Sequence, residues 1–162
     1  MSTQKVYQTL LKHGWTIAFA ESITGGALCA EMVKIPGASK VLLGSIVSYS
    51  TFFKEEILGI EKNLILSEGS VSLKVSDQMA FQIQSKTHAD ICVAITGNAG
   101  PSFELGSTDK IAYISFLIHD EIHRLKLDFG TMNRKDSIDY AVRSTYQKLA
   151  ELLSQKEIEK SL

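Results

Sequence analysis

The chain has 162 residues, a size at which one domain buries about 70% of the surface that its unfolded chain exposes. Hydrophobic residues make up 44% of the sequence and charged residues 22%, which is typical of a globular protein and excludes a disordered chain. The formal net charge is −1, from 17 Lys and Arg and 18 Asp and Glu residues, so the sequence lacks the broad positive charge that nucleic acid requires.

The apolar segments and the metal-binding residue types exclude further classes. An apolar stretch such as residues 111–118 is far shorter than the ~20 residues of a membrane-spanning helix, and residues 1–14 have no signal-peptide core. The four histidines are scattered without metal-ligand spacing, and Cys29 and Cys92 fall in apolar segments. We therefore expect a cytoplasmic protein with two buried thiols, no metal, no cofactor, and neither nucleic acid nor membrane as a partner.

Helices and strands alternate in the first half of the predicted structure. Apolar residues at i, i+4 spacing predict amphipathic helices, and short apolar runs between turn residues predict strands that are buried on both faces. In chain order the expected elements are a helix at 5–12, a strand at 16–20, a helix at 27–33, a strand at 41–48 and a short helix at 51–58.

The second half adds a hairpin and a long final helix. The expected elements are a helix at 72–86, a strand at 91–96, a loop at 97–108, antiparallel strands at 110–118 and 122–129, and a helix at 134–158 whose charged end, 155–162, frays. This order predicts an α/β fold in one domain over residues 1–162, a three-layer α/β/α sandwich with a mixed, mostly parallel sheet. The strand order does not follow from the sequence.

The segment Ala20-Glu-Ser-Ile-Thr-Gly-Gly26 leaves a predicted strand and enters a predicted helix. Amides at the start of a helix lack partners within the helix, so those of Gly25, Gly26 and Ala27 are expected to face an anion. Ser22 and Thr24 supply hydroxyl groups that suit a nucleophile, a helix cap or a ligand donor. The alternative is an ordinary capped turn without a ligand.

Tyr49 and Lys54 form a second candidate group, at the end of the next strand and the start of the following helix. If the two strands are neighbours, both turns lie at one edge of the sheet, and these side chains can reach Ser22. A lysine in a partly apolar pocket has a lowered pKa and can act as a base towards a serine hydroxyl, with the tyrosine as a bridge. The alternative is a solvated lysine on the first helical turn.

The loop Thr96-Gly-Asn-Ala-Gly-Pro101 follows the third strand and brings small residues and backbone donors to the same edge. We expect Gly97, Asn98 and Gly100 to bind substrate there, although a loop of this composition is also ordinary turn chemistry. Arg134 precedes the final helix, where its planar guanidinium can hold a phosphate or only cover the start of the helix.

Taken together, these segments resemble the nicotinamide-nucleotide amidase family, which is also known as the C-terminal domain of the competence/damage-inducible protein CinA. The resemblance covers residues 5–153. The chain resembles a stand-alone form of this domain. The resemblance is carried by residues 20–26, by Ile35-Pro-Gly-Ala-Ser39, by Gly44-Ser-Ile-Val-Ser-Tyr-Ser50 with Lys54, by Leu58-Gly59, and by Ala94-Ile-Thr-Gly-Asn-Ala-Gly-Pro101.

The resemblance implies hydrolysis of nicotinamide mononucleotide to nicotinic acid mononucleotide and ammonia, a step of pyridine nucleotide salvage. It implies Ser22 as the nucleophile, Tyr49 and Lys54 as its activators, and Arg134 as a phosphate ligand. Turn residues, namely Thr24, Gly25 and Gly26, are expected to bind substrate with the loop after the third strand. A homodimer or larger homo-oligomer is common for such sheets and is expected here.

The chain departs from the family pattern after Pro101. Phe103, Glu104 and Leu105 stand where the family has a run of glycines, and Glu104 would repel a phosphate if it pointed inward. The chain departs from the family pattern by smaller changes at two other positions, where it has Ile23 and Thr51. Two alternatives therefore stay open: a catalytically weak or inactive homologue that binds a nucleotide or a partner protein, and a domain that acts in trans with a separate sugar-nucleotide or pterin-related domain.

Overall fold

The computed structural model describes residues 1–103 and 109–161, with side chains up to residue 157. Five strands form one sheet in the order β2-β1-β3-β4-β5. The strands are β1 (Ile17–Glu21), β2 (Leu42–Val47), β3 (Ile91–Gly97), β4 (Ile111–Ile118) and β5 (Glu121–Asp128). β1 is parallel to β2 and β3, whereas β4 runs antiparallel to β3 and β5.

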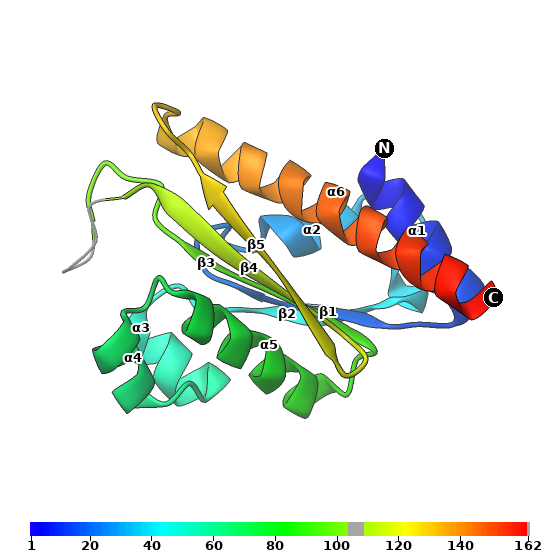
Figure 1. Cartoon of the computed structure of the whole chain (residues 1–162), viewed down its shortest axis with the longest axis horizontal. Helices are drawn as coiled ribbons and strands as arrows, with labels where there is room; N and C mark the ends of the chain where they lie inside the picture. Colours follow the sequence, from blue (N-terminus) through cyan, green and yellow to red (C-terminus); the bar gives the residue numbers. More distant parts are fainter. Residues whose placement is uncertain (104–108, 162) are drawn as a thin grey trace.

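Helices cover both faces of this sheet, as Figure 1 shows. One face carries α1 (Ser2–His13), α2 (Ala27–Val33) and α6 (Arg134–Ser161), and the other carries α3 (Thr51–Phe53), α4 (Lys62–Glu68) and α5 (Leu73–Thr87). Two short segments complete the order, a 3-10 turn η1 (Ala38–Lys40) and a π-helical turn η2 (Lys54–Leu58). The predicted three-layer α/β/α sandwich with a mixed sheet is confirmed.

Two apolar cores, one on each face, hold the layers together. The core under α1, α2 and α6 includes Phe19, Phe116 and Tyr146, and the core under α5 includes Ala18 and Met79. Every residue of β1 is buried because the strand lies inside the sheet with helices on both sides. This burial explains why the short apolar run at residues 16–20 predicts the strand correctly.

The structure differs from the predicted elements in three places. The expected single helix at 51–58 is divided into α3 and η2, and α4 was not predicted. The third difference is the unpredicted 3-10 turn η1. At the C-terminus α6 is helical to Ser161, and the expectation that residues 155–162 fray stays a prediction. Lys156 pairs there with Glu121 at 2.6 Å, and Glu157 pairs with Lys12 at 2.9 Å, so contacts with β5 and α1 hold the segment.

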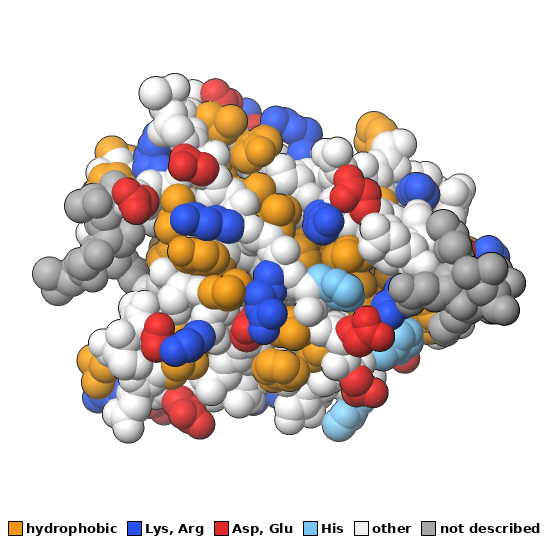
Figure 2. Space-filling view, in the orientation of Figure 1, with side chains coloured by type: hydrophobic (Ala, Val, Ile, Leu, Met, Phe, Trp, Pro, Cys, Tyr) orange, Lys and Arg blue, Asp and Glu red, His pale blue; other side chains and the backbone are white. Residues whose placement is uncertain are grey.

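The surface is mixed in charge on the face that Figure 2 shows, where basic and acidic side chains are interspersed over the exposed side of β5 and the helices. No helix among the described residues is long and apolar enough to cross a membrane.

Candidate active site

The candidate site lies where three neighbouring parallel strands end. β1, β2 and β3 end at Glu21, Val47 and Gly97, and the chain leaves all three at one edge of the sheet. Backbone hydrogen bonds extend this alignment past the strands, since the Ser22 amide donates to Ile95 O at 3.0 Å and the Ser48 amide donates to Glu21 O at 2.7 Å. The turns after β1 and β2 therefore lie side by side, as the predicted site requires.

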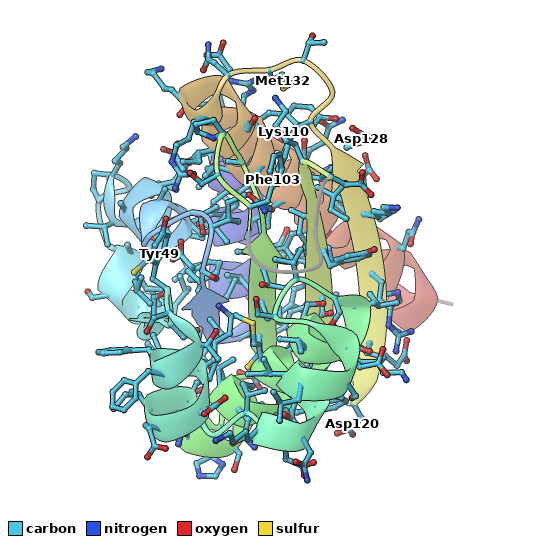
Figure 3. All side chains as sticks on the ribbon, turned by 90° about the vertical axis from the view of Figure 1, so that its left-hand side faces the viewer. Tyr49, Phe103, Lys110, Asp120, Asp128 and Met132 are labelled. Atoms are coloured by element: carbon cyan, nitrogen blue, oxygen red, sulfur yellow. The ribbon has the colours of Figure 1, made fainter. Side chains whose placement is uncertain are left out.

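A cavity of about 460 Å³ opens at this edge. It is lined by Ser22 and Ile23 after β1, Tyr49 after β2, residues 97–103 after β3, and Arg134 at the start of α6. Figure 3 faces this end of the molecule and shows Tyr49 and Phe103 on it. A cavity of this volume, whose walls combine small residues with the polar side chains of Ser22, Asn98 and Arg134, suits a small organic ligand.

Lys54 reaches the candidate nucleophile directly. Its Nζ lies 2.9 Å from Ser22 Oγ, 3.1 Å from Ser48 O and 3.4 Å from Tyr49 O. Only 1% of the Lys54 surface is exposed, because η2 begins at this residue and turns the side chain inward under the strand ends. The solvated lysine that the sequence left open is therefore not what the structure contains.

The Tyr49 side chain does not bridge serine and lysine. Its hydroxyl accepts a hydrogen bond of 2.7 Å from Arg134 Nη2, while only its backbone carbonyl accepts from Lys54. Arg134 also donates to Gly100 O at 2.8 Å, so its guanidinium links the segment after β2 to the segment after β3 across the cavity. The predicted bridge is therefore wrong, because the Tyr49 phenol is hydrogen-bonded to Arg134.

The expected anion site at the start of α2 is also corrected. The Gly25 amide donates to Ser22 O and the Ala27 amide donates to Thr24 O, both at 3.0 Å. The other donors at this turn are taken by the buried carboxylate of Glu21, at 2.8 to 3.1 Å. These donors are the hydroxyl groups of Thr24 and Ser45 and the amides of Gly26, Leu28 and Cys29.

Because Glu21 already supplies the negative charge that this helix start attracts, the amides of Gly25, Gly26 and Ala27 are not free for a phosphate or an oxyanion. Thr24, Gly25 and Gly26 do not line the cavity, and they therefore support Ser22 without facing a ligand. Glu21 is the residue that sequence reasoning missed. An acidic residue at the end of an otherwise apolar strand was the available signal.

The loop after β3 forms the opposite wall, as predicted. Gly97, Asn98 and Gly100 all line the cavity. The Asn98 amide donates to Ile111 O at 2.8 Å, and its Oδ1 accepts from the Gly100 amide at 3.1 Å, whereas its buried Nδ2 has no hydrogen-bond partner among the described residues. An unpaired buried donor of this kind is uncommon and often marks a functional site.

The two thiols take no part in this cavity. Cys92 is fully buried inside β3, and burial raises the pKa of its thiol to about 12. Cys29 is partly buried, and its pKa is raised by burial and by the nearby Glu21 carboxylate. Thiolates are the reactive form of cysteine, so both groups are poor nucleophiles.

Comparison with known proteins now identifies the family. A family model described as the CinA C-terminal domain matches residues 1–153. The chain belongs to this family. A CinA-like protein of Petrotoga mobilis is 40% identical over 124 residues, which is 75% of this chain and 30% of that protein. A CinA-like protein of Prochlorococcus marinus is 45% identical over 109 residues, which is 65% of this chain and 25% of that protein.

Solved structures of CinA proteins have the same fold. A CinA superfamily protein from Klebsiella pneumoniae superposes with a TM-score of 0.90 at 26% identity, covering 95% of this chain and 96% of that one. A competence or damage-inducible protein from Enterobacter asburiae gives 0.86 at 28% identity, covering 95% of both chains. The chain thus spans about a third or less of the length of the first curated relatives but nearly all of these two solved chains.

The loop that follows Pro101 is described only in part. Phe103 lines the cavity and is 41% exposed. The expectations for Glu104 and Leu105 lie outside the described residues.

Proposed function

We propose that this CinA domain is an amidohydrolase that deamidates nicotinamide mononucleotide to nicotinic acid mononucleotide and ammonia, with Ser22 as the nucleophile and the cytoplasm as its location. One observation carries the proposal, the 2.9 Å hydrogen bond between the buried amine of Lys54 and Ser22 Oγ at the cavity. A serine next to a buried base, at the edge of a cavity of nucleotide size, is the arrangement that acyl transfer requires.

Lys54 acts as the base in this mechanism. An amine that is removed from water loses part of its preference for the charged form. In the neutral form its two N–H groups donate to the carbonyls of Ser48 and Tyr49, and its lone pair is directed at the Ser22 hydroxyl. The backbone thus orients the amine to accept the serine proton, a role that the Tyr49 phenol does not need to fill.

The reaction proceeds through an acyl-enzyme. Ser22 Oγ forms a bond to the carboxamide carbon while its proton moves to Lys54, and Lys54 then passes that proton to the leaving nitrogen as the C–N bond breaks and ammonia departs. Water attacks the ester, its proton moves through Lys54 to Ser22 Oγ, and the carboxylic acid is released.

Arg134 binds the phosphate in this proposal. Two of its N–H groups hold the cavity walls through Gly100 O and the Tyr49 hydroxyl, and the rest of its planar fork is available to a dianion. Tyr49 therefore acts as the positioning partner of Arg134 and supplies a carbonyl to Lys54.

The test is ammonia release from nicotinamide mononucleotide, measured beside free nicotinamide and NAD. We expect turnover of the mononucleotide, and we expect Ser22→Ala and Lys54→Met each to lose at least about a hundredfold in kcat/KM because they remove the nucleophile or its base. Ser67→Ala, at an exposed position of α4, is the matched control and should keep full activity.

Activity of Ser22→Ala within tenfold of wild type would contradict the covalent mechanism, because water would then attack directly. Calorimetric binding of the mononucleotide without ammonia release would instead favour the other candidate, a catalytically weak or inactive homologue that binds a nucleotide.

A further inference from the structure

We propose that Phe103 recognises the ring of the substrate: its aromatic face, together with that of Tyr49, binds a cationic N-ribosylated pyridinium. The inference rests on the proposed function and goes beyond it, because it assigns the selection of a positively charged heteroaromatic ring to a side chain in the segment that departs from the family pattern.

The position of Phe103 supports this role. Phe103 and Tyr49 are the two aromatic residues among the described walls of the cavity, and they come from the segments that follow β3 and β2. Both lie on the end of the molecule that Figure 3 faces. They are 41% and 56% exposed, so each ring has surface available for a ligand.

The Phe103 ring lies beside the proposed phosphate site. A Cβ placed on Gly100 would be 3.7 Å from Phe103 Cζ, and Gly100 O accepts a hydrogen bond from Arg134. The ring therefore lies near the backbone segment to which the guanidinium donates. A ligand with a ring at one end and a phosphate at the other can engage both groups.

Core packing does not account for Phe103. Neither apolar core includes it, although large apolar side chains elsewhere in the sheet and helices fill these cores. An exposed phenyl group in a cavity wall is available for recognition, because its apolar surface stays in contact with water until a ligand covers it.

Charge decides which ring suits this cavity. The described walls of this cavity contain no Asp or Glu, and Arg134 is their one charged residue, whereas Asp109 and Asp128 line a neighbouring cavity that Phe103 also borders. Aromatic faces carry the negative part of the ring quadrupole and attract a cation that lies within about 6 Å of the ring centre. Phe103 and Tyr49 therefore supply the attraction that a carboxylate would supply in another site.

The experiment compares two ligands that differ in the ring alone. Nicotinamide mononucleotide and its reduced dihydro form share the carboxamide, ribose and phosphate, but only the oxidised ring is aromatic and cationic. In the Ser22→Ala background, calorimetry should show roughly threefold to thirtyfold tighter binding of the oxidised form. Adding Phe103→Leu should reduce this ratio to about one to two, and adding Phe103→Trp should keep or raise it.

Phe81→Leu is the matched control, because Phe81 is 48% exposed on α5 and does not line the cavity. It should leave the ratio unchanged. In the active enzyme, Phe103→Leu should raise KM for the mononucleotide several-fold and leave kcat within about twofold, since the ring does not touch the reacting carbon.

The outcomes separate this inference from the proposed function. If Phe103→Leu leaves the ratio of affinities for the oxidised and reduced mononucleotide unchanged, the proposed role of Phe103 is overturned, even if ammonia release shows the amidase to be active. If Phe103→Leu changes the ratio of the two affinities but wild type releases no ammonia, the proposal of ring recognition stands and the proposed amidase activity is overturned. Failure of the Ser22→Ala protein to bind either form overturns the inference.

Discussion

Lys54 and Cys92 are both buried, but burial has a different chemical consequence for each side chain. The Lys54 amine is surrounded by a hydroxyl and two carbonyl oxygens, so it is buried without losing its hydrogen bonds. The Cys92 thiol lies within β3 and makes a long hydrogen bond of 3.9 Å to Ala89 O. The first group is placed for proton transfer, whereas the second stays neutral and inert.

The raised pKa of Cys92 leads to a prediction about alkaline stability. In the unfolded chain the thiol ionises above its ordinary value near 9, whereas burial keeps it protonated in the folded protein up to about 12. The contribution of the buried neutral thiol to the free energy of unfolding is therefore fully present below pH 9, and it is lost as the pH rises from 9 towards 12.

We expect wild type to lose about 1 kcal/mol more of its free energy of unfolding than Cys92→Ala between pH 8 and pH 10, measured by urea denaturation. Ser67→Ala, which removes no titratable group from an exposed position of α4, is the control and should follow wild type. Parallel pH dependence of wild type and Cys92→Ala would show that the thiol ionises equally in both states.

At the scale of elements, the start of α2 depends on the end of β1. Glu21 accepts hydrogen bonds from two hydroxyl groups and three amides, and it joins α2 to β2 through Ser45. Ser22 is the next residue, so the same carboxylate fixes the turn that presents the candidate nucleophile. A buried carboxylate that is fully hydrogen-bonded in this way is expensive to alter, because its partners are buried as well.

Glu21→Gln should therefore destabilise the fold. The amide group of glutamine would direct N–H donors at donors, so at least two hydrogen bonds are lost and buried groups stay unpaired. We expect the free energy of unfolding to fall by about 2 kcal/mol or more, measured by urea denaturation, with lower ammonia release at temperatures where the variant stays folded. Glu31→Gln, which loses only a surface ion pair with Lys34 on the same helix, should change stability by less than about 1 kcal/mol. Equal stability of the two variants would refute the role assigned to Glu21.

For the whole molecule, contacts between the chain ends complete one layer. α6 lies along α1 in Figure 1, and both chain termini are at the same end of the molecule. Glu157 accepts hydrogen bonds from Lys12 and His13, both at 2.9 Å, while Lys156 pairs with Glu121 at the start of β5. The last turns of α6 therefore join the first helix to the hairpin. The homo-oligomeric state expected from the sequence stays a prediction, which the mass of the protein in solution checks.

Removing these pairs should weaken the fold. Replacing Lys156 and Glu157 together by alanine should lower the free energy of unfolding by about 1 kcal/mol at neutral pH, because several linked pairs are lost at once. Lys12 and His13 lower the pKa of Glu157, so its contribution is present above the ordinary value of 4.5 and is lost as the pH falls below it.

The difference from wild type in urea denaturation should accordingly shrink at acid pH. Lys135→Ala, which breaks an exposed pair with Asp139 at the other end of α6, is the control and should have little effect. If the double variant is as stable as wild type at neutral pH, the segment frays as its charged sequence suggests.

The sequence by itself determined most of the elements and the candidate pair Ser22 and Lys54. Buried strands such as β1 and β3 are predictable because the helices on both faces require an unbroken apolar run, and that run is a local property. Ser22 and Lys54 were predictable as candidates because turns at the carboxyl ends of parallel strands collect at one edge. Local patterns report such features because they depend on residues only a few positions apart.

Tertiary structure alone decided the strand order and the partners of the polar groups. The order β2-β1-β3 places the Ser22 turn between two others, and it follows from packing rather than from any single segment. Glu21 binds Ser45, and Arg134 binds Tyr49, 85 positions away in the chain. A hydrogen-bonding side chain takes whichever partner the fold brings within about 3 Å, and local sequence does not encode that distance.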